Sequence, residues 1–180
     1  LLRLEELARD FVAPVDACRS WCALYAGAAK LVDDVREHIH LEYYIYMPDR
    51  TGTRLRDALV ERARAGIKVR LLLDAVGSSK IGRRFLQPLL EAGGEVAWFH
   101  PVRFRPATRS WVNLRSHRKL VVVDGRVGFT GGINITDEEN ERLRADAYRD
   151  LHLRLEGDVV RSLQLVFVED WAYATGERDF

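Results

Sequence analysis

The sequence predicts an α/β fold in which a mixed, mostly parallel β-sheet is flanked by helices. Between residues 39 and 100, three strand-like apolar runs alternate with two helix-like runs. Such strand–helix repeats form parallel sheets that helices cover. Further on, Asp124-Gly125 separates two apolar runs, which predicts an added hairpin. The 180 residues, 47% hydrophobic and 31% charged, suffice for one globular domain with a buried core.

Residues 1–37 form the first predicted unit, an N-terminal helical segment that Pro14 interrupts. Cys18 and Cys22 lie four residues apart in this segment, so on a helix they would share one face. A single pair of this kind predicts neither a zinc site nor a disulfide framework. Residues 38–180 form the second predicted unit.

The second unit opens with a strand at 39–47, which is rich in β-branched and aromatic residues. Apolar residues at helical spacing then predict a helix over 53–65, with Gly66 as its C-cap. The later elements are predicted from the same kinds of pattern. They are a strand at 67–76, a helix at 80–92 broken by Pro88, a strand at 95–100, a long loop at 101–114, the two hairpin strands, a loop or short helix at 137–147, a strand at 150–157, and a closing helix with Val160, Leu163, Phe167 and Trp171 on one side.

Charge is unevenly distributed, although the net charge is only +1. Residues 96–123 contain no Asp or Glu, while six basic and four aromatic side chains are interleaved there. A basic, aromatic surface suits phosphates or an anionic membrane interface. A solvated loop with its aromatic residues in the core is the alternative, and composition alone favours it. No apolar run reaches about 18 residues, so no membrane span is predicted. Because the chain begins at Leu1, we expect a piece of a longer protein.

The hairpin places several polar groups together if Asp124 and Gly125 are its two loop residues. Lys119 then faces Thr130, His117 faces Gly132, and Asn134 is the diagonal neighbour of His117. These side chains share one face because strand side chains repeat every two residues. The absent side chain of Gly132 would leave a pocket that fits a tetrahedral phosphate. A three-residue loop would shift this register, and the alternative is a hairpin whose polar residues only mark a strand edge.

The motif resembles the H-x-K-x4-D-x6-G-G-x-N signature, or HKD motif, of the phospholipase D superfamily. Its fixed positions are His117, Lys119, Asp124, Gly131, Gly132 and Asn134. The resemblance extends over about residues 38–176, which are similar to the first half of bacterial cardiolipin synthases. It implies that residues 38–180 are a phospholipase D-like catalytic half-domain with one HKD motif.

The resemblance also implies roles for these residues. Members of the superfamily are metal-independent phosphodiesterases and phosphatidyltransferases, so no metal and no cofactor is expected. His117 would be the nucleophile that forms a phosphohistidine, and imidazole is largely neutral near pH 7, as a nucleophile requires. Lys119 and Asn134 would bind the phosphoryl oxygens, and Gly131 and Gly132 would give the backbone room. A second histidine, from another motif, would protonate the leaving alcohol.

Three carboxylates are further candidates. Asp150 corresponds to the acidic residue with which the family holds its catalytic histidine, although a plain strand-start charge is the alternative. Asp124 falls in the hairpin turn, points away from His117, and is predicted to support the loop. Glu42 stands in an otherwise apolar strand, where an unpaired carboxylate is uncommon; contact with the site and a strand-edge charge are both open. The four histidines outside the motif are interpreted as structural: His38, His40, His100 and His152.

The chain lacks a second H-x-K, whereas a cardiolipin synthase has two. The expected partner is therefore a second HKD half, either a missing C-terminal half or a second copy of this chain. The leading hypothesis is a phosphatidyltransferase of cardiolipin synthase type, which converts phosphatidylglycerol to cardiolipin and glycerol.

Two alternatives to that hypothesis remain. One is a homodimeric single-motif phosphodiesterase, acting as a phospholipase D or a nuclease. The other is an inactive half that binds phosphate groups. The leading hypothesis implies anionic phospholipid and a membrane surface as partners, no specific nucleic acid, and a location at the bacterial cytoplasmic membrane.

Overall fold

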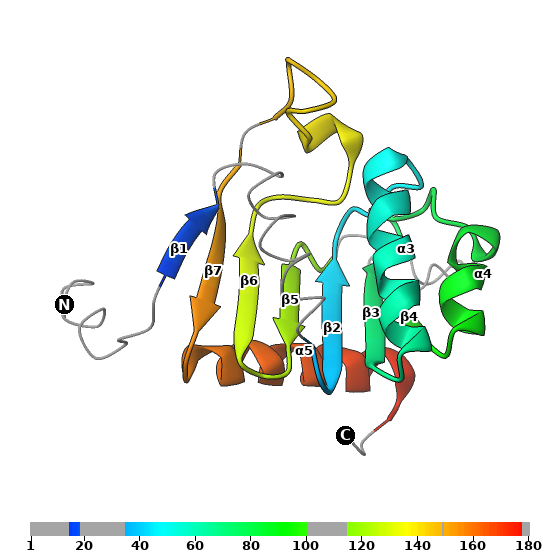
Figure 1. Cartoon of the computed structure of the whole chain (residues 1–180), viewed down its shortest axis with the longest axis vertical. Helices are drawn as coiled ribbons and strands as arrows, with labels where there is room; N and C mark the ends of the chain where they lie inside the picture. Colours follow the sequence, from blue (N-terminus) through cyan, green and yellow to red (C-terminus); the bar gives the residue numbers. More distant parts are fainter. Residues whose placement is uncertain (1–14, 19–34, 101–114, 149, 178–180) are drawn as a thin grey trace, which may run out of the picture.

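The computed structural model describes residues 15–18, 35–100, 115–148 and 150–177 (Figure 1). The expectations for Pro14, Cys22 and the basic loop at 101–114 lie outside the described residues. The elements, in chain order, are β1 (Val15–Cys18), β2 (His38–Tyr43), α3 (Arg50–Arg64), β3 (Lys68–Asp74), α4 (Arg83–Glu91), β4 (Glu95–Phe99), β5 (Lys119–Val123), β6 (Val127–Gly131), the 3-10 helix η2 (Asp137–Glu139), β7 (His152–Glu156) and α5 (Val159–Thr175).

The seven described strands form one sheet in the order β1-β7-β6-β5-β2-β3-β4. The prediction of a mixed sheet is confirmed, but its mostly parallel character is wrong. Only β2–β3 and β3–β4 are parallel, and the other four described pairings are antiparallel. The helical crossovers end at β4, after which β5 and β6 form a hairpin, and a short turn can join only antiparallel strands.

The first strand corrects the helical interpretation of the N-terminal segment. Val15–Cys18 pairs antiparallel with β7, with Cys18 opposite His152. Cys18 therefore lies in a strand and shares no helix face with Cys22. The edge of β7 offers unpaired backbone groups, and such long-range pairing overrides a local helical preference.

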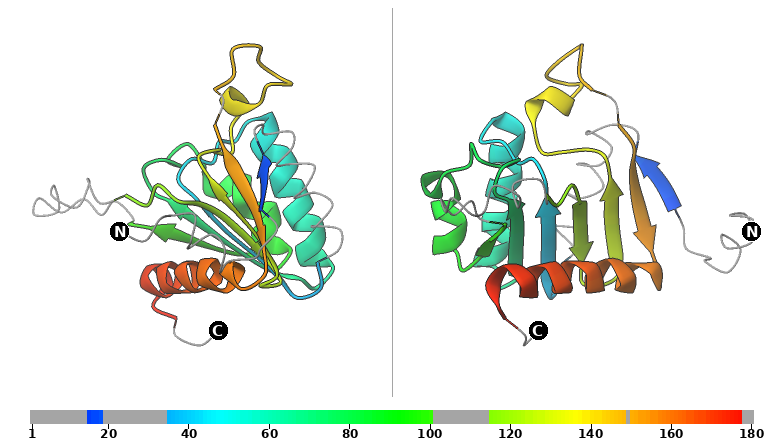
Figure 2. Two further views of the ribbon diagram at one scale, coloured as in Figure 1. Left: turned by 90° about the vertical axis from the view of Figure 1, so that its left-hand side faces the viewer. Right: turned by 180° about the vertical axis from the view of Figure 1, so that it is seen from behind.

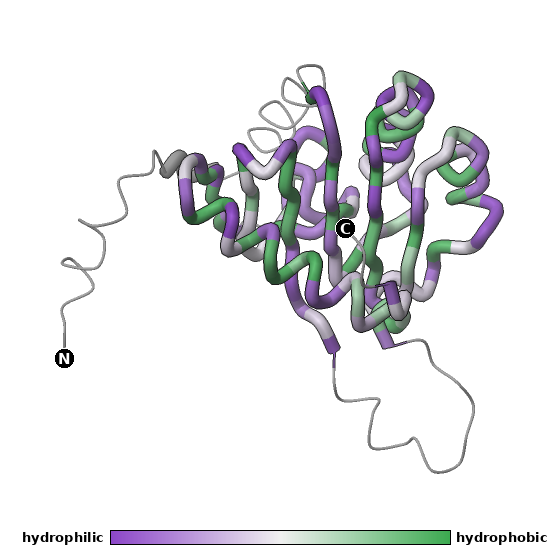
Figure 3. The backbone as a smooth tube through the Cα atoms, turned by 90° about the horizontal axis from the view of Figure 1, so that it is seen from below, coloured by the Kyte–Doolittle hydropathy of each residue, from purple (hydrophilic) through white to green (hydrophobic). Residues whose placement is uncertain are grey.

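Helices cover both faces of the sheet. Figure 2 shows α3 and α4 on one side and α5 running across the strands on the other. Ile39, Leu41 and Phe129 belong to the core on the α3–α4 side, whereas Leu120 and Val122 pack on the α5 side. Hydrophobic and hydrophilic turns alternate along α5 in Figure 3, and the predicted inward set is confirmed, with the buried side chains Val160, Phe167 and Trp171.

The hairpin turn differs from the predicted one. Leu120 faces Thr130 and Val123 faces Val127, so three residues rather than two connect the strands. Asp124 takes a left-handed φ of 51°, and its carboxylate accepts the backbone N–H groups of residues 36, 37 and 38, each at 2.9 Å. This anchor to the start of β2 accounts for the extra turn residue. The predicted pairings of Lys119 with Thr130 and of His117 with Gly132 are therefore wrong, because each is shifted by one residue.

Candidate active site

The motif residues other than Asp124 gather where several strands of the sheet begin or end, at the top of the sheet in Figure 1. Here β2 and β6 end while β5 and β7 begin. His117 and Lys119 lie at the start of β5, and Gly131, Gly132 and Asn134 lie at the end of β6. The antiparallel hairpin thus returns the end of the motif to its beginning.

The exposed imidazole of His117 lies against the ring of Tyr44, just beyond the end of β2. The two ring centroids are 3.9 Å apart and the ring planes are inclined by 19°. Stacking of this kind limits the orientations open to an imidazole. Tyr44 was not predicted, although its place in an aromatic run, directly after a buried strand, was a usable signal.

Tyr44 is itself fixed by the turn that follows β3. Ser78 donates its hydroxyl to the Tyr44 carbonyl at 3.0 Å. A Cβ on Gly77 would come within 2.2 Å of that carbonyl oxygen and 2.8 Å of the Tyr44 ring. Glycine at position 77 therefore allows the close approach that holds Tyr44 beneath His117.

Lys119 is almost fully buried, with 9% of its surface exposed. Its Nζ donates to the backbone carbonyl of His117 at 2.9 Å and lies 5.4 Å from the centroid of the Tyr44 ring. Burial lowers the pKa of Lys119, while the charges of Glu139 and Asp150 act to raise it. An ammonium has three hydrogens, so two are available to a ligand after the bond to His117.

Asn134 is held by a residue that the sequence analysis missed. Its backbone N–H and its Nδ2 both donate to the Glu139 carboxylate, each at 2.7 Å, and its Oδ1 accepts the N–H of Ile45 at 3.3 Å. These contacts fix the amide with Nδ2 as the donor, and Nδ2 keeps a second hydrogen. Glu139 could have been predicted, because Asn134 is a polar motif residue that needs a hydrogen-bond partner and the acidic run 137–139 follows it closely.

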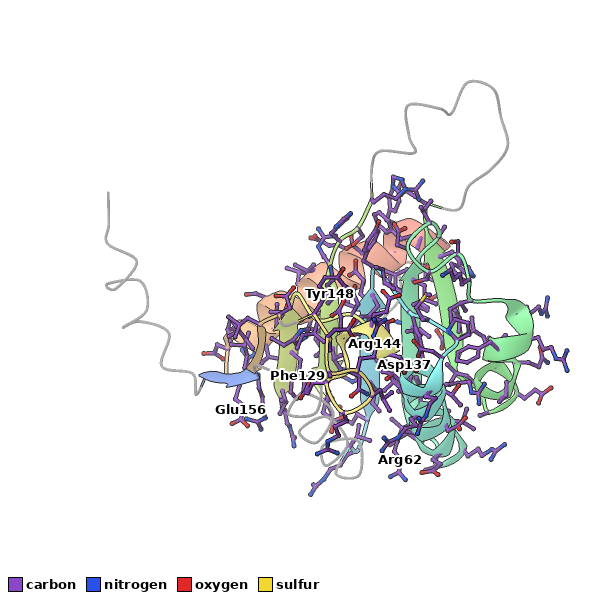
Figure 4. The ribbon with its side chains drawn as sticks, turned by 90° about the horizontal axis from the view of Figure 1, so that it is seen from above. Arg62, Phe129, Asp137, Arg144, Tyr148 and Glu156 are labelled. Carbon is purple, nitrogen blue, oxygen red and sulfur yellow. The ribbon has the colours of Figure 1, made fainter. Side chains whose placement is uncertain are left out.

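The η2 loop that carries Glu139 is tied to the start of α3. Thr51 donates its backbone N–H to Asp137 at 2.8 Å, and Asp137 donates its own to Asp49 at 2.7 Å. In the view from above, the loop with Asp137, Arg144 and Tyr148 lies across this edge of the sheet (Figure 4). The loop therefore joins the end of β6 to the helical side of the domain.

Asp150 fills the space that was predicted to be an empty pocket. A Cβ on Gly132 would lie 2.0 Å from Asp150 Oδ2, and one on Gly131 would lie 2.2 Å from the Leu151 carbonyl. Because Gly131 and Gly132 have no side chains, the segment that leads into β7 can pack closely against them. The Asp150 carboxylate accepts the N–H of Leu151 at 2.7 Å; within the described part of the chain, no hydrogen bond joins it to His117, so its role as the partner of His117 stays a prediction.

His152 lies in the same row of the sheet as Lys119. Gly131 of β6 is paired with His152 of β7. On its other side, Gly131 lies opposite Lys119 of β5, one residue pair beyond Leu120–Thr130. His152 is fully buried, and neither of its ring nitrogens has a hydrogen-bond partner among the described residues. Burial lowers the pKa of His152 to about 4, so the imidazole is neutral near pH 7.

Glu42 lies on the α5 side of the sheet, where it is 1% exposed. Ser116 donates its hydroxyl to Glu42 at 2.5 Å, and the Arg118 guanidinium lies 3.8 Å away and also pairs with Asp170 of α5. Burial raises the pKa of Glu42 to about 7, which the Ser116 hydrogen bond opposes. Glu42 is thus no strand-edge charge, and it reaches the motif through the two neighbours of His117.

Asp124 lies at the opposite end of the hairpin from His117, among backbone donors. Burial would raise its pKa, but the backbone hydrogen bonds from residues 36–38 outweigh this and lower it. Its contacts support the predicted structural assignment. His38 and His40 are bridged by Gln164 of α5, and His100 stacks on Phe99.

The described residues contain no group of three or more His, Cys, Asp or Glu that could hold a metal ion. None of the described helices combines the length and the apolar character needed to cross a bilayer.

The amino-acid sequence of this chain is similar to those of known proteins. A family model described as "Cardiolipin synthase, PLD-like domain" matches residues 30–170. Cardiolipin synthase 1 of Bacillus cereus is 46% identical over 152 residues, which are 84% of this chain and 30% of that protein. Cardiolipin synthase of Geobacillus kaustophilus is 47% identical over 148 residues, covering 82% of this chain and 29% of the relative. The chain thus spans about 30% of the length of these curated relatives.

Solved structures share the fold. Nuc from Salmonella typhimurium, a phospholipase D family member, superposes with a TM-score of 0.64 at 16% identity, over 93% of this chain and 98% of that one. NucT from Helicobacter pylori superposes with a TM-score of 0.65 at 13% identity, over 90% of this chain and 98% of that one.

Proposed function

The chain belongs to the cardiolipin-synthase family of phospholipase D-like domains, and we propose that it supplies one half of an active site for phosphatidyl transfer. The observation that carries the proposal is the geometry at the start of β5. There an exposed imidazole stacks on Tyr44 beside a buried ammonium that has donors to spare. Phosphoryl transfer needs this kind of positioning and charge neutralisation more than elaborate chemistry.

In the first step, the His117 ring nitrogen attacks the phosphorus of phosphatidylglycerol. A P–N bond forms, the P–O bond to the glycerol headgroup breaks, and a proton from a general acid on the second half goes to the leaving oxygen. The ammonium of Lys119 and the second hydrogen on Asn134 Nδ2 bind the non-bridging oxygens, where negative charge accumulates. Asp150 holds the other ring nitrogen of His117 when substrate is bound, which fixes the tautomer.

In the second step, a hydroxyl of another phosphatidylglycerol attacks the phosphohistidine. Its proton passes to the same group on the second half, the P–O bond of cardiolipin forms, and the P–N bond breaks. No described residue near His117 is a cationic acid free of these roles: Lys119 is engaged, and burial keeps His152 neutral. The second half is therefore a C-terminal continuation of this chain or a second copy of it.

Product analysis tests this proposal. Phosphatidylglycerol vesicles and a chelator are incubated with the protein in the presence of its second half, beside the same assembly carrying His117→Asn, and the lipids are identified by mass spectrometry. We expect cardiolipin and glycerol only from the unmutated assembly. Phosphatidic acid as the sole product would identify a hydrolase instead. Equal binding of phosphate groups by both proteins without turnover would identify a docking half.

The partners follow from this substrate. We propose that the protein works at the surface of the bacterial cytoplasmic membrane, on anionic phospholipid. The acid-free, basic and aromatic sequence at 96–123 supports this. Vesicle flotation with and without phosphatidylglycerol tests it, and equal flotation with neutral vesicles would count against recognition of the anionic headgroup.

A further inference from the structure

Both neighbours of His117 are held by groups on the α5 side of the sheet. Ser116 donates to the Glu42 carboxylate at 2.5 Å. Arg118 pairs with Asp170 and approaches Glu42 to 3.8 Å. His117, between them, takes no part in this cluster and lies on the Tyr44 ring instead. The segment is thus fixed on either side of the imidazole.

The cluster is charge-balanced only when it holds one proton. Both carboxylates approach the single Arg118 guanidinium, which pairs with Asp170 and lies 3.8 Å from Glu42. Burial, and to a smaller extent the charge of Asp170, raises the pKa of Glu42 and so favours its protonated form. Glu42 Oε2 is buried and has no hydrogen-bond partner among the described residues. The proton and the Arg118 cation together neutralise two carboxylates.

In the part of the chain that the structure describes, the strand neighbours of Glu42 carry no charge. Its neighbours across the sheet are Leu72 on β3 and Leu120 on β5. From α5, Asp170 faces it, and Glu169 raises the pKa of Asp170 by repulsion, after burial as the main cause. A buried pair of like charges is stable only when neutralised, so the cluster depends on Arg118 and on the protonated form of Glu42.

We propose that the Glu42–Asp170 pair positions the nucleophile: by holding Ser116 and Arg118 on the α5 side, it orients His117 against Tyr44 for attack. This inference rests on the proposed function of His117 and adds two positioning residues to it. Glu42 and Asp170 act through the backbone of residues 116–118 and touch no substrate. The burial that brings the pKa of Glu42 to about 7 keeps the proton in place up to neutral pH.

Two substitutions at Glu42 separate positioning from charge. Glu42→Gln copies the neutral form of the acid and keeps a carbonyl oxygen that can accept from Ser116. Glu42→Ala removes the acceptor of Ser116 and the contact with Arg118. We expect Glu42→Ala to lower kcat by about 100-fold with KM nearly unchanged, the scale of a misplaced reacting group. Glu42→Gln should restore kcat to within a few-fold of the unmutated protein and make it less sensitive to pH above 7.

Gln164→Ala is the matched control, because it removes hydrogen bonds to His38 and His40 between the same two elements, β2 and α5. It should leave kcat unchanged. A structural readout independent of turnover is the nuclear Overhauser effect between the rings of His117 and Tyr44. We expect it in the unmutated chain, in Glu42→Gln and in Gln164→Ala, and not in Glu42→Ala.

The two readouts keep this inference apart from the proposed function. Persistence of the ring-to-ring effect in a folded Glu42→Ala chain would overturn the positioning role. So would equal losses of kcat in Glu42→Ala and Gln164→Ala. If the unmutated protein formed no product while the ring contact still responded to Glu42, the proposed function would fail and the positioning role would stand.

Discussion

The imidazole of His117 is stacked on the ring of Tyr44, with the ring centroids 3.9 Å apart. This pair joins the motif at the start of β5 to the end of β2, and through Gly77 and Ser78 to the turn after β3. The orientation of the proposed nucleophile is therefore set by three strands of the sheet. An isolated hairpin would not supply it.

Removing the stack should slow phosphatidyl transfer without unfolding the protein. Aromatic stacking contributes about 0.5–1.5 kcal/mol beyond burial, so Tyr44→Ala should lower kcat by up to about tenfold. Tyr44→Phe keeps the ring and should retain kcat. Steady-state kinetics on phosphatidylglycerol vesicles measure both, and a loss of the same size in Tyr44→Phe would assign the effect to the hydroxyl.

Gly132→Ala should displace the Asp150 carboxylate, because the new Cβ would lie 2.0 Å from Oδ2. Because Asp150 is exposed, its side chain can swing away at little cost in folding stability, but moving it should lower kcat. Gly82→Ala is the control, since its φ is −100° and a Cβ added there would meet no heavy atom within 4 Å among the described residues. Chemical denaturation and kinetics of the two variants check this; equal behaviour would contradict the close approach of Asp150.

Asp124→Ala should destabilise the protein but spare catalysis. It leaves the N–H groups of residues 36–38 without their acceptor, and one bond to a charged group contributes about 1.5–3 kcal/mol. The folded pKa of Asp124 is lowered, so its contribution is present above its unfolded pKa and is lost as the pH falls through the folded value. Denaturation from acid to neutral pH should show the gap between the two proteins narrowing in acid. A kcat loss at saturating substrate in folded Asp124→Ala would contradict a purely structural role.

The raised pKa of Glu42 predicts that the free energy of unfolding falls as pH rises, the opposite of the dependence expected from Asp124. Burial raises the pKa of Glu42 from 4.5 to about 7, so its proton is retained in the folded chain while the unfolded chain ionises. Stability should therefore fall as pH rises from about 4.5 to about 7, by roughly 3 kcal/mol, and stay lower above that. Glu42→Gln should remove this slope. Denaturation of both proteins across this range tests it, and parallel stability curves would show that folding does not raise the pKa of Glu42.

Local pattern was sufficient to predict most elements of the fold. Apolar spacing placed α3 and α5, and Asp124-Gly125 placed the hairpin. The strand Val15–Cys18 was missed because its reason for being extended is the open edge of β7, which lies far along the chain and pairs with it through Leu155 and His152. The parallel character of the sheet was overestimated because the strand–helix repeat stops at β4.

The motif residues were predicted because their spacing is specific, whereas their partners were not. The turn includes Arg126 as a third residue because Asp124 binds the backbone of residues 36–38, which lie far from the turn in the sequence. Glu139 and Tyr44 belong to no short pattern with His117, and only the folded chain brings them to Asn134 and His117. Asp150 was expected near the motif, but its place in the space over Gly132 depends on how β7 enters the sheet, which no local pattern specifies.

The most direct test of the account is to trap the covalent intermediate on His117. A phosphatidyl ester of p-nitrophenol has a leaving group that needs no general acid, so this half of the site is sufficient for the first step. We predict a burst of nitrophenolate matching the amount of protein, and a mass increase of one phosphatidyl group on the peptide that contains His117. The His117→Asn variant should show neither. Nitrophenolate release without an adduct on His117, or an equal burst from His117→Asn, would contradict the central claim.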